Sequence, residues 1–208
     1  MKVILVNGSP NKEGCTFTAL SVVASELKAQ SIDTEIFNIG NNVTGCSACF
    51  ACAKMKNNRC VINDTVNEFL TKAEKADGFV FGSPVYFASG SGQINSFLDR
   101  AFFVARNTIF PHKPAACLVS CRRGGASAAL DNLNKYPTIS QMPLVTSRYW
   151  NIIHGTTPDE IKQDGEGMQV MQYIGRNMAW LLKSIETGKK AGIVPPTTEK
   201  SVRTNFIR

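Results

Sequence analysis

The stretch "VILVNGSPNKEGCT", residues 3–16, indicates the fold class. Its first four residues are all apolar, as in a strand buried on both faces, and a loop rich in Gly, Ser and Asn follows directly. Apolar residues at helical spacing come next: Phe17, Leu20, Ala24 and Leu27. The opening of the chain therefore predicts a buried strand, a short polar loop and an amphipathic helix, in that order.

The same alternation continues along the chain. Strands are expected at residues 3–7, 34–39, 77–83, 114–120 and 142–150. After the first helix, further helices are expected at residues 66–73, 93–104, 126–133 and 166–185. Such alternation is typical of parallel strands joined by right-handed crossovers. We therefore expect one three-layer α/β sandwich, residues 1–190, followed by a C-terminal tail at 191–208.

The composition is that of one globular domain. The chain has 208 residues, of which 43% are hydrophobic and 19% are charged. The first strand leaves no room for a signal peptide, and no apolar run approaches the ~20 residues that span a membrane. We therefore expect a cytoplasmic protein without a membrane partner, whose seven cysteines are thiols, metal ligands or redox groups rather than disulfides.

The net charge points to anionic partners. A formal charge of +7 favours them, and phosphate cofactors belong to this class as well as nucleic acid. The lysines and arginines are scattered, however, and no basic stripe is interleaved with aromatic residues. Nucleic acid is therefore not expected as a partner.

The loop after the first strand has the composition of a phosphate site. Ligands of open α/β sheets bind beyond the carboxyl ends of the strands. This loop runs into a helix and offers hydroxyls and backbone amides from Ser9, Asn11, Gly14, Cys15 and Thr16. It has neither the ending of a nucleoside-triphosphate loop nor a Gly-x-Gly-x-x-Gly, so a phosphomonoester fits better. The alternative is an ordinary strand-to-helix turn.

The loops after the third and fourth strands have features that complete a ligand site. The first of them, in "GSPVYFASGSGQIN" (82–95), offers an aromatic surface and exposed amides to a flat ring; its candidates are Ser83, Pro84, Val85, Tyr86 and Phe87. The second, "SCRRGG" (120–125), offers cations and a close approach at its glycines; its candidates are Ser120, Cys121, Arg122, Gly124 and Gly125. The alternatives are core aromatics and a surface arginine pair.

Four cysteines stand close together in "GCSACFACAKMKNNRC", residues 45–60. Cys46, Cys49 and Cys52 follow a Cys-x2-Cys-x2-Cys pattern, and Cys60 comes seven residues later, which resembles the ligation of a [4Fe-4S] cluster. Zinc usually takes two separated Cys-x2-Cys pairs, and free thiols without a metal are the third alternative. The surrounding segment, residues 40–63, exceeds the ~12–15 residues usual for a loop without function.

Three other features are assigned no function. The histidines, His112 and His154, are expected to be structural or at the surface, and Asp99 and Arg100 are expected to be solvated charges on a helix. A Cys-x5-Arg spacing that begins at Cys117 matches that of tyrosine phosphatases, but this cysteine lies inside an apolar strand, where no phosphate loop starts.

The three loops together resemble the NADPH-dependent FMN reductase family of flavodoxin-like proteins. The resemblance rests on "GSPNKEGCT", "FGSPVYFASGSGQINSFLDR" and "VSCRRGG", in that order and spacing, and the cysteine run resembles the iron-sulfur flavoprotein branch. It implies a flavodoxin-like, five-stranded parallel sheet in the order 2-1-3-4-5. It also implies non-covalent FMN, with its phosphate in the first loop and its ring at the other two, and a homodimer or homotetramer.

Two functions follow from this resemblance. In one, an NAD(P)H-dependent oxidoreductase passes reducing equivalents through FMN to a quinone, a flavin or another small acceptor, and no side chain acts as catalytic acid or base. In the other, a [4Fe-4S] cluster on the four cysteines exchanges single electrons with a ferredoxin-like carrier. The choice between NADH and NADPH stays open.

Overall fold

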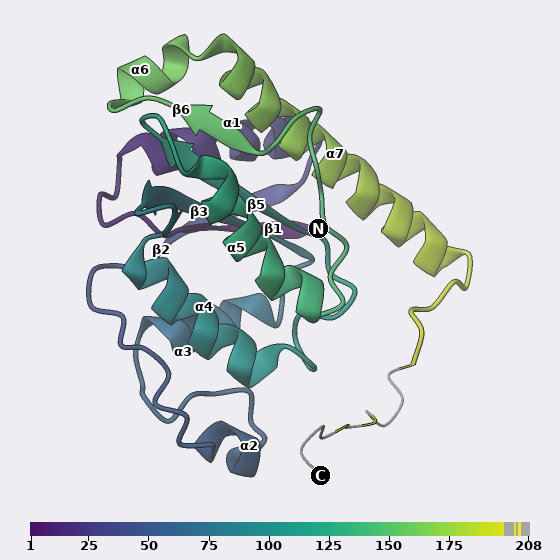
Figure 1. The fold of residues 1–208 in the computed structure, drawn as a ribbon. Helices are drawn as coiled ribbons and strands as arrows, with labels where there is room; N and C mark the ends of the chain where they lie inside the picture. Colours follow the sequence, from purple (N-terminus) through teal and green to yellow (C-terminus); the bar gives the residue numbers. More distant parts are fainter. Residues whose placement is uncertain (198–201, 203, 205–208) are drawn as a thin grey trace.

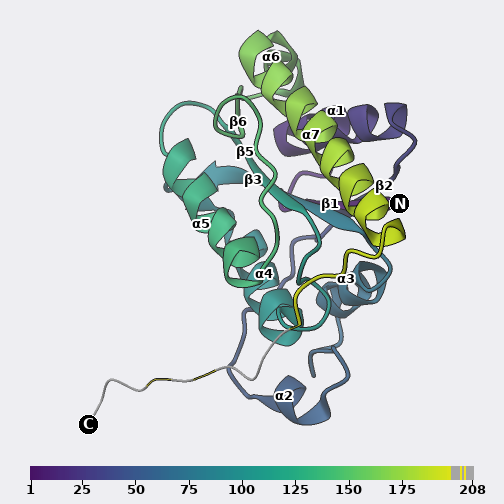
Figure 2. The ribbon, with the colours of Figure 1, turned by 90° about the vertical axis from the view of Figure 1, so that its right-hand side faces the viewer.

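The computed structural model describes residues 1–197, 202 and 204, and it shows a central sheet between two layers of helices (Figures 1 and 2). The strands are β1 (Lys2–Asn7), β2 (Asp33–Asn38), β3 (Gly78–Tyr86), β4 (Ser89–Gly90), β5 (Ala115–Cys121) and β6 (Ile152–His154). The helices are α1 (Cys15–Ala29), α2 (Ala51–Met55), α3 (Thr65–Ala73), α4 (Gly92–Ala105), α5 (Ala126–Ile139), α6 (Pro158–Gln163) and α7 (Gly165–Lys190). Within the described residues, no helix has the length and apolar character needed to cross a membrane. The predicted tail, 191–208, lies partly outside these residues and stays a prediction.

The order of the sheet is the expected one. Five strands run parallel in the order β2-β1-β3-β5-β6, which is 2-1-3-4-5 when the parallel strands alone are counted along the chain. The sheet has six strands rather than five, because β3 turns back at its end and pairs antiparallel with the two-residue β4. The α/β sandwich is therefore confirmed, with one short strand added.

The position predicted for the fifth parallel strand, residues 142–150, was wrong. The strand that pairs with β5 is β6, and of the predicted segment only Leu144 forms an isolated bridge, to Ala115. Pro143 has no N–H to donate to a ladder. Just before β6 begins, the Asn151 side chain donates to the carbonyl of Cys117 in β5 (2.9 Å). This bond fixes the end of the irregular segment to the sheet.

The central strands are buried on both faces, and alternate residues supply two separate cores. In β1, Val3 and Leu5 pack against α1 and α7, whereas Ile4 and Val6 pack against α3 and α4. The same division holds in β3 and β5, because successive side chains of a strand point to opposite faces. Both faces are therefore covered by helices, and only the ends of the strands are open to a ligand (Figure 1).

Helices α1 and α7 approach each other closely at Gly175. A Cβ at this position would lie 2.6 Å from the Cβ of Glu26 and 2.9 Å from the carbonyl oxygen of Val23. At Gly188, in the same helix, a Cβ would lie 3.8 Å from the nearest atoms of Ile193, which is an ordinary van der Waals contact. The two glycines therefore differ in packing although they share one helix.

We predict opposite effects of alanine at these two glycines. Gly175→Ala lowers the free energy of unfolding by about 1–3 kcal/mol, because α1 and α7 must move apart. Gly188→Ala raises it by about 0.5–1 kcal/mol, because alanine favours the helix and its Cβ clashes with no atom. Denaturant unfolding of both variants tests this, and equal shifts would contradict the close α1–α7 contact.

Candidate functional site

The loop after β1 meets the carboxyl ends of β3 and β5 at one cavity of about 180 Å³. Five of the residues predicted for a phosphate site line it: Ser9, Asn11, Gly14, Cys15 and Thr16. Pro84 and Ser120 from the other two predicted loops also line it, together with Thr156 and Pro158. The structure therefore brings the first predicted loop together with one residue from each of the other two.

Sequence reasoning missed Thr156 and Pro158. They follow β6, which was expected at 142–150 and lies instead at Ile152–His154. The segment "TTPDE" carried a usable signal, since a threonine followed by proline is typical of a helix start. Thr157 indeed caps α6, accepting from the amide of Glu160.

The start of α1 has free hydrogen-bond donors. Its N-cap residue is Gly14, which has no side chain, so none caps the first amides of the helix. Amides at the positive end of a helix dipole attract an anion. The cavity beside this helix end is therefore suited to a phosphate.

The loop that leads into α1 is held by its own side chains. The Ser9 hydroxyl accepts from the amide of Asn11 (3.1 Å), and the Asn11 side chain accepts from the amide of Glu13 (3.2 Å). Asn7, fully buried, donates to the Asn38 side chain (2.8 Å) and accepts from the Ser9 amide (3.1 Å). These bonds fix the shape of the loop before any ligand binds.

Two predicted residues join α1 to β5 at the floor of the cavity. The hydroxyls of Thr16 and Ser120 lie 2.8 Å apart, and both residues are buried. Next to them, Cys15 donates through sulfur to the Gly155 carbonyl (3.8 Å). Burial raises the pKa of the Cys15 thiol, so this cysteine stays neutral beside an anion.

The turn between β3 and β4 exposes the aromatic surface predicted for a ring. Phe87 and Ala88 form its tip, both with positive φ (50° and 59°), and Phe87 is fully exposed. Tyr86 is 47% exposed and Val85 half-buried. Ser83 has a different role from its neighbours: it is buried, accepts from the Ser91 amide (3.0 Å) and donates to the Pro84 carbonyl (2.8 Å). It therefore holds the turn in place from below.

The loop after β5 packs directly against this turn. Gly125 has a φ of +87°, and a Cβ on it would lie 2.9 Å from the Cα of Ala88. Gly124 faces open space, Arg122 is exposed, and Cys121 is buried with its sulfur donating to the Gly124 carbonyl (3.2 Å). Gly125 therefore brings the two predicted ring loops together.

A second cavity, of about 290 Å³, adjoins Gly125. Arg123 lines it beside the pair Tyr149 and Trp150, whose rings lie 5.0 Å apart and are exposed. His154 also lines it, at the end of β6. This cavity therefore lies directly beside the loop after β5.

The four cysteines of residues 45–60 line one further cavity, which lies away from the first two. Its other walls include Arg100, Phe103 and Val104 of α4. Helix α2 lies inside this loop, and both views place it beyond α3 and α4 from the sheet (Figures 1 and 2). Cys46 and Cys49 are exposed, whereas Cys52 and Cys60 are half-buried.

Four thiols around one cavity are the type of donor that binds an iron-sulfur cluster or a four-thiolate zinc ion. Within the described part of the chain, however, no three His, Cys, Asp or Glu side chains are grouped closely enough to hold one metal ion. The amide of Ala51 lowers the pKa of the Cys49 thiol, and burial raises that of Cys52.

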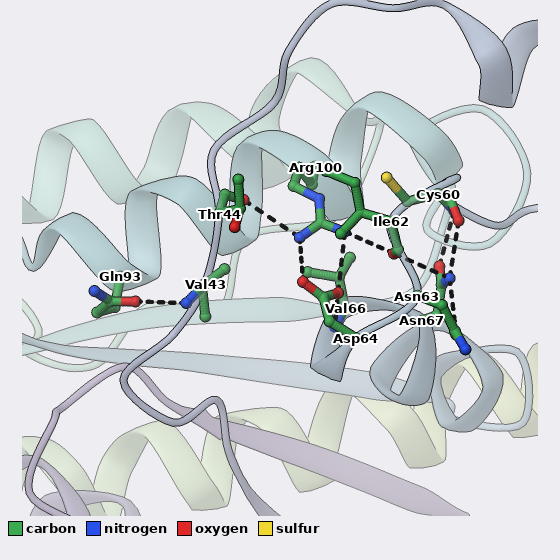
Figure 3. A network of polar contacts seen from close by, with 10 residues as sticks. All are labelled: Val43, Thr44, Cys60, Ile62, Asn63, Asp64, Val66, Asn67, Gln93 and Arg100. Carbon is green, nitrogen blue, oxygen red and sulfur yellow. Dashed lines mark hydrogen bonds and ion pairs between the residues drawn. The ribbon is translucent and has the colours of Figure 1, made fainter.

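Both ends of the cysteine loop are fixed to helices (Figure 3). The side chain of Asn67 in α3 holds the backbone of Cys60 from both sides, accepting from its amide (2.8 Å) and donating to its carbonyl (2.9 Å). At the other end, the Val43 amide donates to the Gln93 side chain (2.9 Å). The loop is therefore anchored although its middle is exposed.

Arg100 was predicted to be solvated, and this was wrong: it is 1% exposed. Its guanidinium makes a two-bond ion pair with Asp64 (2.5 and 3.0 Å) and donates to the carbonyls of Thr44 and Ile62. The residue lies three positions after Phe97, on the buried face of α4. Asp99 is at the surface, where it accepts from the Tyr136 hydroxyl (2.6 Å).

Comparisons with known proteins agree with this geometry. A family model described as NADPH-dependent FMN reductase matches residues 1–157. An iron-sulfur flavoprotein of Methanocaldococcus jannaschii is 29% identical over 197 residues, 89% of this chain and 100% of that protein. One from Archaeoglobus fulgidus is 32% identical over 175 residues, 80% of this chain and 83% of that protein.

The solved structures show the fold. A flavodoxin from the domain Archaea has a TM-score of 0.59 at 12% identity, covering 88% of this chain and 99% of its own. The flavodoxin-like expectation is therefore confirmed. The chain belongs to the NADPH-dependent FMN reductase family of flavin-dependent oxidoreductases, in its iron-sulfur flavoprotein branch.

Proposed function

We propose that this chain holds FMN at the carboxyl edge of its sheet and uses it to pass reducing equivalents from NAD(P)H to a quinone, a flavin or another small acceptor. The observation that carries the proposal is the uncapped start of α1, which faces a cavity lined by Ser9, Thr16 and Ser120. Hydroxyls and helix amides at one point are the groups that bind a phosphomonoester. Membership of the FMN reductase family identifies that ester as FMN.

The chain's own residues bind and orient the cofactor. In this proposal Ser9, Asn11, Gly14, Cys15 and Thr16 would hold the phosphate, and the turn at Pro84–Phe87 and the loop at Cys121–Gly125 would together hold the ring. Bound FMN supplies the redox chemistry, since it accepts a hydride and releases electrons in pairs or singly. Backbone amides of both loops would stabilise negative charge on the reduced ring. The 290 Å³ cavity beside Gly125 would admit the donor, and Arg123, which lines it, would meet the donor's phosphates.

A second function is supported by the cysteine cavity. Four thiols around one cavity suit a [4Fe-4S] cluster, and the relatives are named iron-sulfur flavoproteins. The cluster would be held by Cys46, Cys49, Cys52 and Cys60 and would serve one-electron exchange with a ferredoxin-like carrier. Because α3 and α4 separate the cysteines from the sheet (Figure 2), each centre is held by its own set of elements. A homodimer or homotetramer remains part of the proposal.

We predict that NADPH reduces the bound flavin directly. Under anaerobic conditions, addition of NADPH to the FMN-loaded protein should remove the flavin absorbance, and a quinone should restore it. The same titration with NADH determines which nicotinamide is preferred. A flavin that keeps its absorbance with both donors would contradict the oxidoreductase proposal and leave a carrier that is reduced by another protein.

The phosphate site is tested by Thr16→Val, with Thr18→Val as its matched control. Thr16 lines the cavity, whereas Thr18, two residues further along α1, donates its hydroxyl to the Gly14 carbonyl (3.2 Å). We expect Thr16→Val to weaken FMN binding by about tenfold or more, equivalent to about 1.4 kcal/mol. Riboflavin, which lacks the phosphate, should bind both variants and the wild type equally. Equal FMN affinity of the two variants would place the phosphate elsewhere.

The cysteine site is tested by Cys52→Ser. We expect this variant to lose iron and acid-labile sulfide together while FMN stays stoichiometric, because different elements hold the two groups. Iron, zinc, sulfide and flavin measured on anaerobically purified wild type and variant decide the question. Zinc without sulfide in the wild type would indicate a zinc site, and neither metal nor sulfide would indicate free thiols.

A further inference from the structure

Arg100 has one buried donor without a partner. Four of its five N–H groups are used by Asp64, Thr44 and Ile62. The fifth, on Nε, is buried and has no hydrogen-bond partner among the described residues. A buried donor left unpaired is costly, so native proteins rarely keep one without a use.

The surroundings of Arg100 show where that donor can be used. Arg100 lines the same cavity as the four cysteines, and Figure 3 shows Cys60 next to it. Cys60 is half-buried in the wall of that cavity, and no hydrogen bond joins its sulfur to Arg100 in this structure.

Arg100 also joins the two ends of the cysteine loop. The Thr44 carbonyl, two residues before Cys46, and the Ile62 carbonyl, two residues after Cys60, both accept from it (3.3 and 2.9 Å). The planar guanidinium can make these bonds and the two-bond ion pair with Asp64 at the same time. The ammonium group of a lysine lacks this planar set of donors.

We propose that Arg100 is the positioning residue of the four-cysteine site, which closes the loop on its ligands and donates its free Nε–H to the Cys60 sulfur when the site is filled. The proposal rests on the cluster proposed above. Hydrogen bonds to cluster sulfurs and nearby charge set the reduction potential, because they stabilise the more negative, reduced form. Arg100 therefore raises the potential of the cluster and slows its loss.

The ion pair with Asp64 allows a test by the direction in which the cluster potential shifts. Arg100→Lys keeps the charge but removes the Nε donor and the planar fork, so the cluster potential should become more negative. Asp64→Asn leaves the guanidinium without its counter-charge, so the potential should become more positive; asparagine still caps α3, where Asp64 now accepts from the Val66 amide (3.1 Å). A merely structural role would change stability in both variants without opposite shifts of the potential.

Arg59→Lys is the matched control. Arg59 precedes Cys60 directly, but its guanidinium pairs with Glu74 (2.8 Å) and donates to the Asn58 carbonyl (2.8 Å). The control therefore makes the same chemical change beside the same ligand without touching the cysteine cavity. Its cluster potential should equal that of the wild type.

The experiment uses the full chain, loaded with FMN and reconstituted anaerobically with iron and sulfide. We would measure the cluster potential by redox titration, the rate at which a chelator removes iron, and the flavin content. Arg100→Lys should lose iron about 10- to 100-fold faster than the wild type. Removing the hydrogen-bond partner of a metal ligand usually weakens metal binding by a factor of this size. Flavin content should be the same in all four proteins.

The possible outcomes separate this inference from the cluster proposal. Wild-type protein that binds neither iron nor sulfide would overturn the cluster and this inference together. A wild-type cluster whose potential is unchanged in Arg100→Lys, or shifts in the same direction in Arg100→Lys and Asp64→Asn, would overturn this inference alone. If Arg100→Lys does not fold, Asp64→Asn decides: a positive shift supports the role of Arg100, and no shift overturns it.

Discussion

Burial of β1, β3 and β5 on both faces is the constraint on which the rest of the structure depends. Each of these strands gives alternate side chains to two different cores, so helices must cover both faces of the sheet. The strand ends are left for a ligand, and there the loop after β1 meets the carboxyl ends of β3 and β5. The candidate FMN site is therefore a consequence of the sheet: the uncapped start of α1 lies beside the end of β3 because β1 and β3 are neighbouring strands.

A second, independent anchor holds the cysteine loop. This loop leaves the sheet after β2 and returns at α3, and no strand fixes its course. A buried cation takes that role: Arg100 gathers carbonyls from both sides of the loop around its ion pair with Asp64. Removing one partner of a buried ion pair is strongly destabilising, because the other charge is then left uncompensated. Arg100, Asp64 and the loop therefore form one structural unit. One chain thus carries two candidate redox sites, of which one depends on sheet topology and the other on a buried ion pair.

Local sequence patterns predicted the features that local chemistry determines. The apolar run of Val3–Val6, the polar loop behind it and the helix at Cys15 were all recognisable, because each is a property of neighbouring residues. Local patterns failed where the environment of a residue depends on residues far away in the sequence. Arg100 was expected in solvent because charged residues usually lie there, and its partner Asp64 stands 36 positions away. Thr156 was missed because the strand before it was placed at 142–150, where a single bridge from Leu144 to Ala115 forms instead of a ladder. The role of Ser83 likewise depends on the turn back to Ser91.

The central claim is that one chain holds FMN and an iron-sulfur cluster at two separate sites. The absorption spectrum of protein purified without oxygen tests it most directly. The account predicts the two resolved bands of oxidised flavin on top of broad iron-sulfur absorption, with the broad component alone removed by a chelator. A colourless protein that takes up no added FMN would contradict the account at both sites, and flavin bands without the broad component would contradict it at the cysteines.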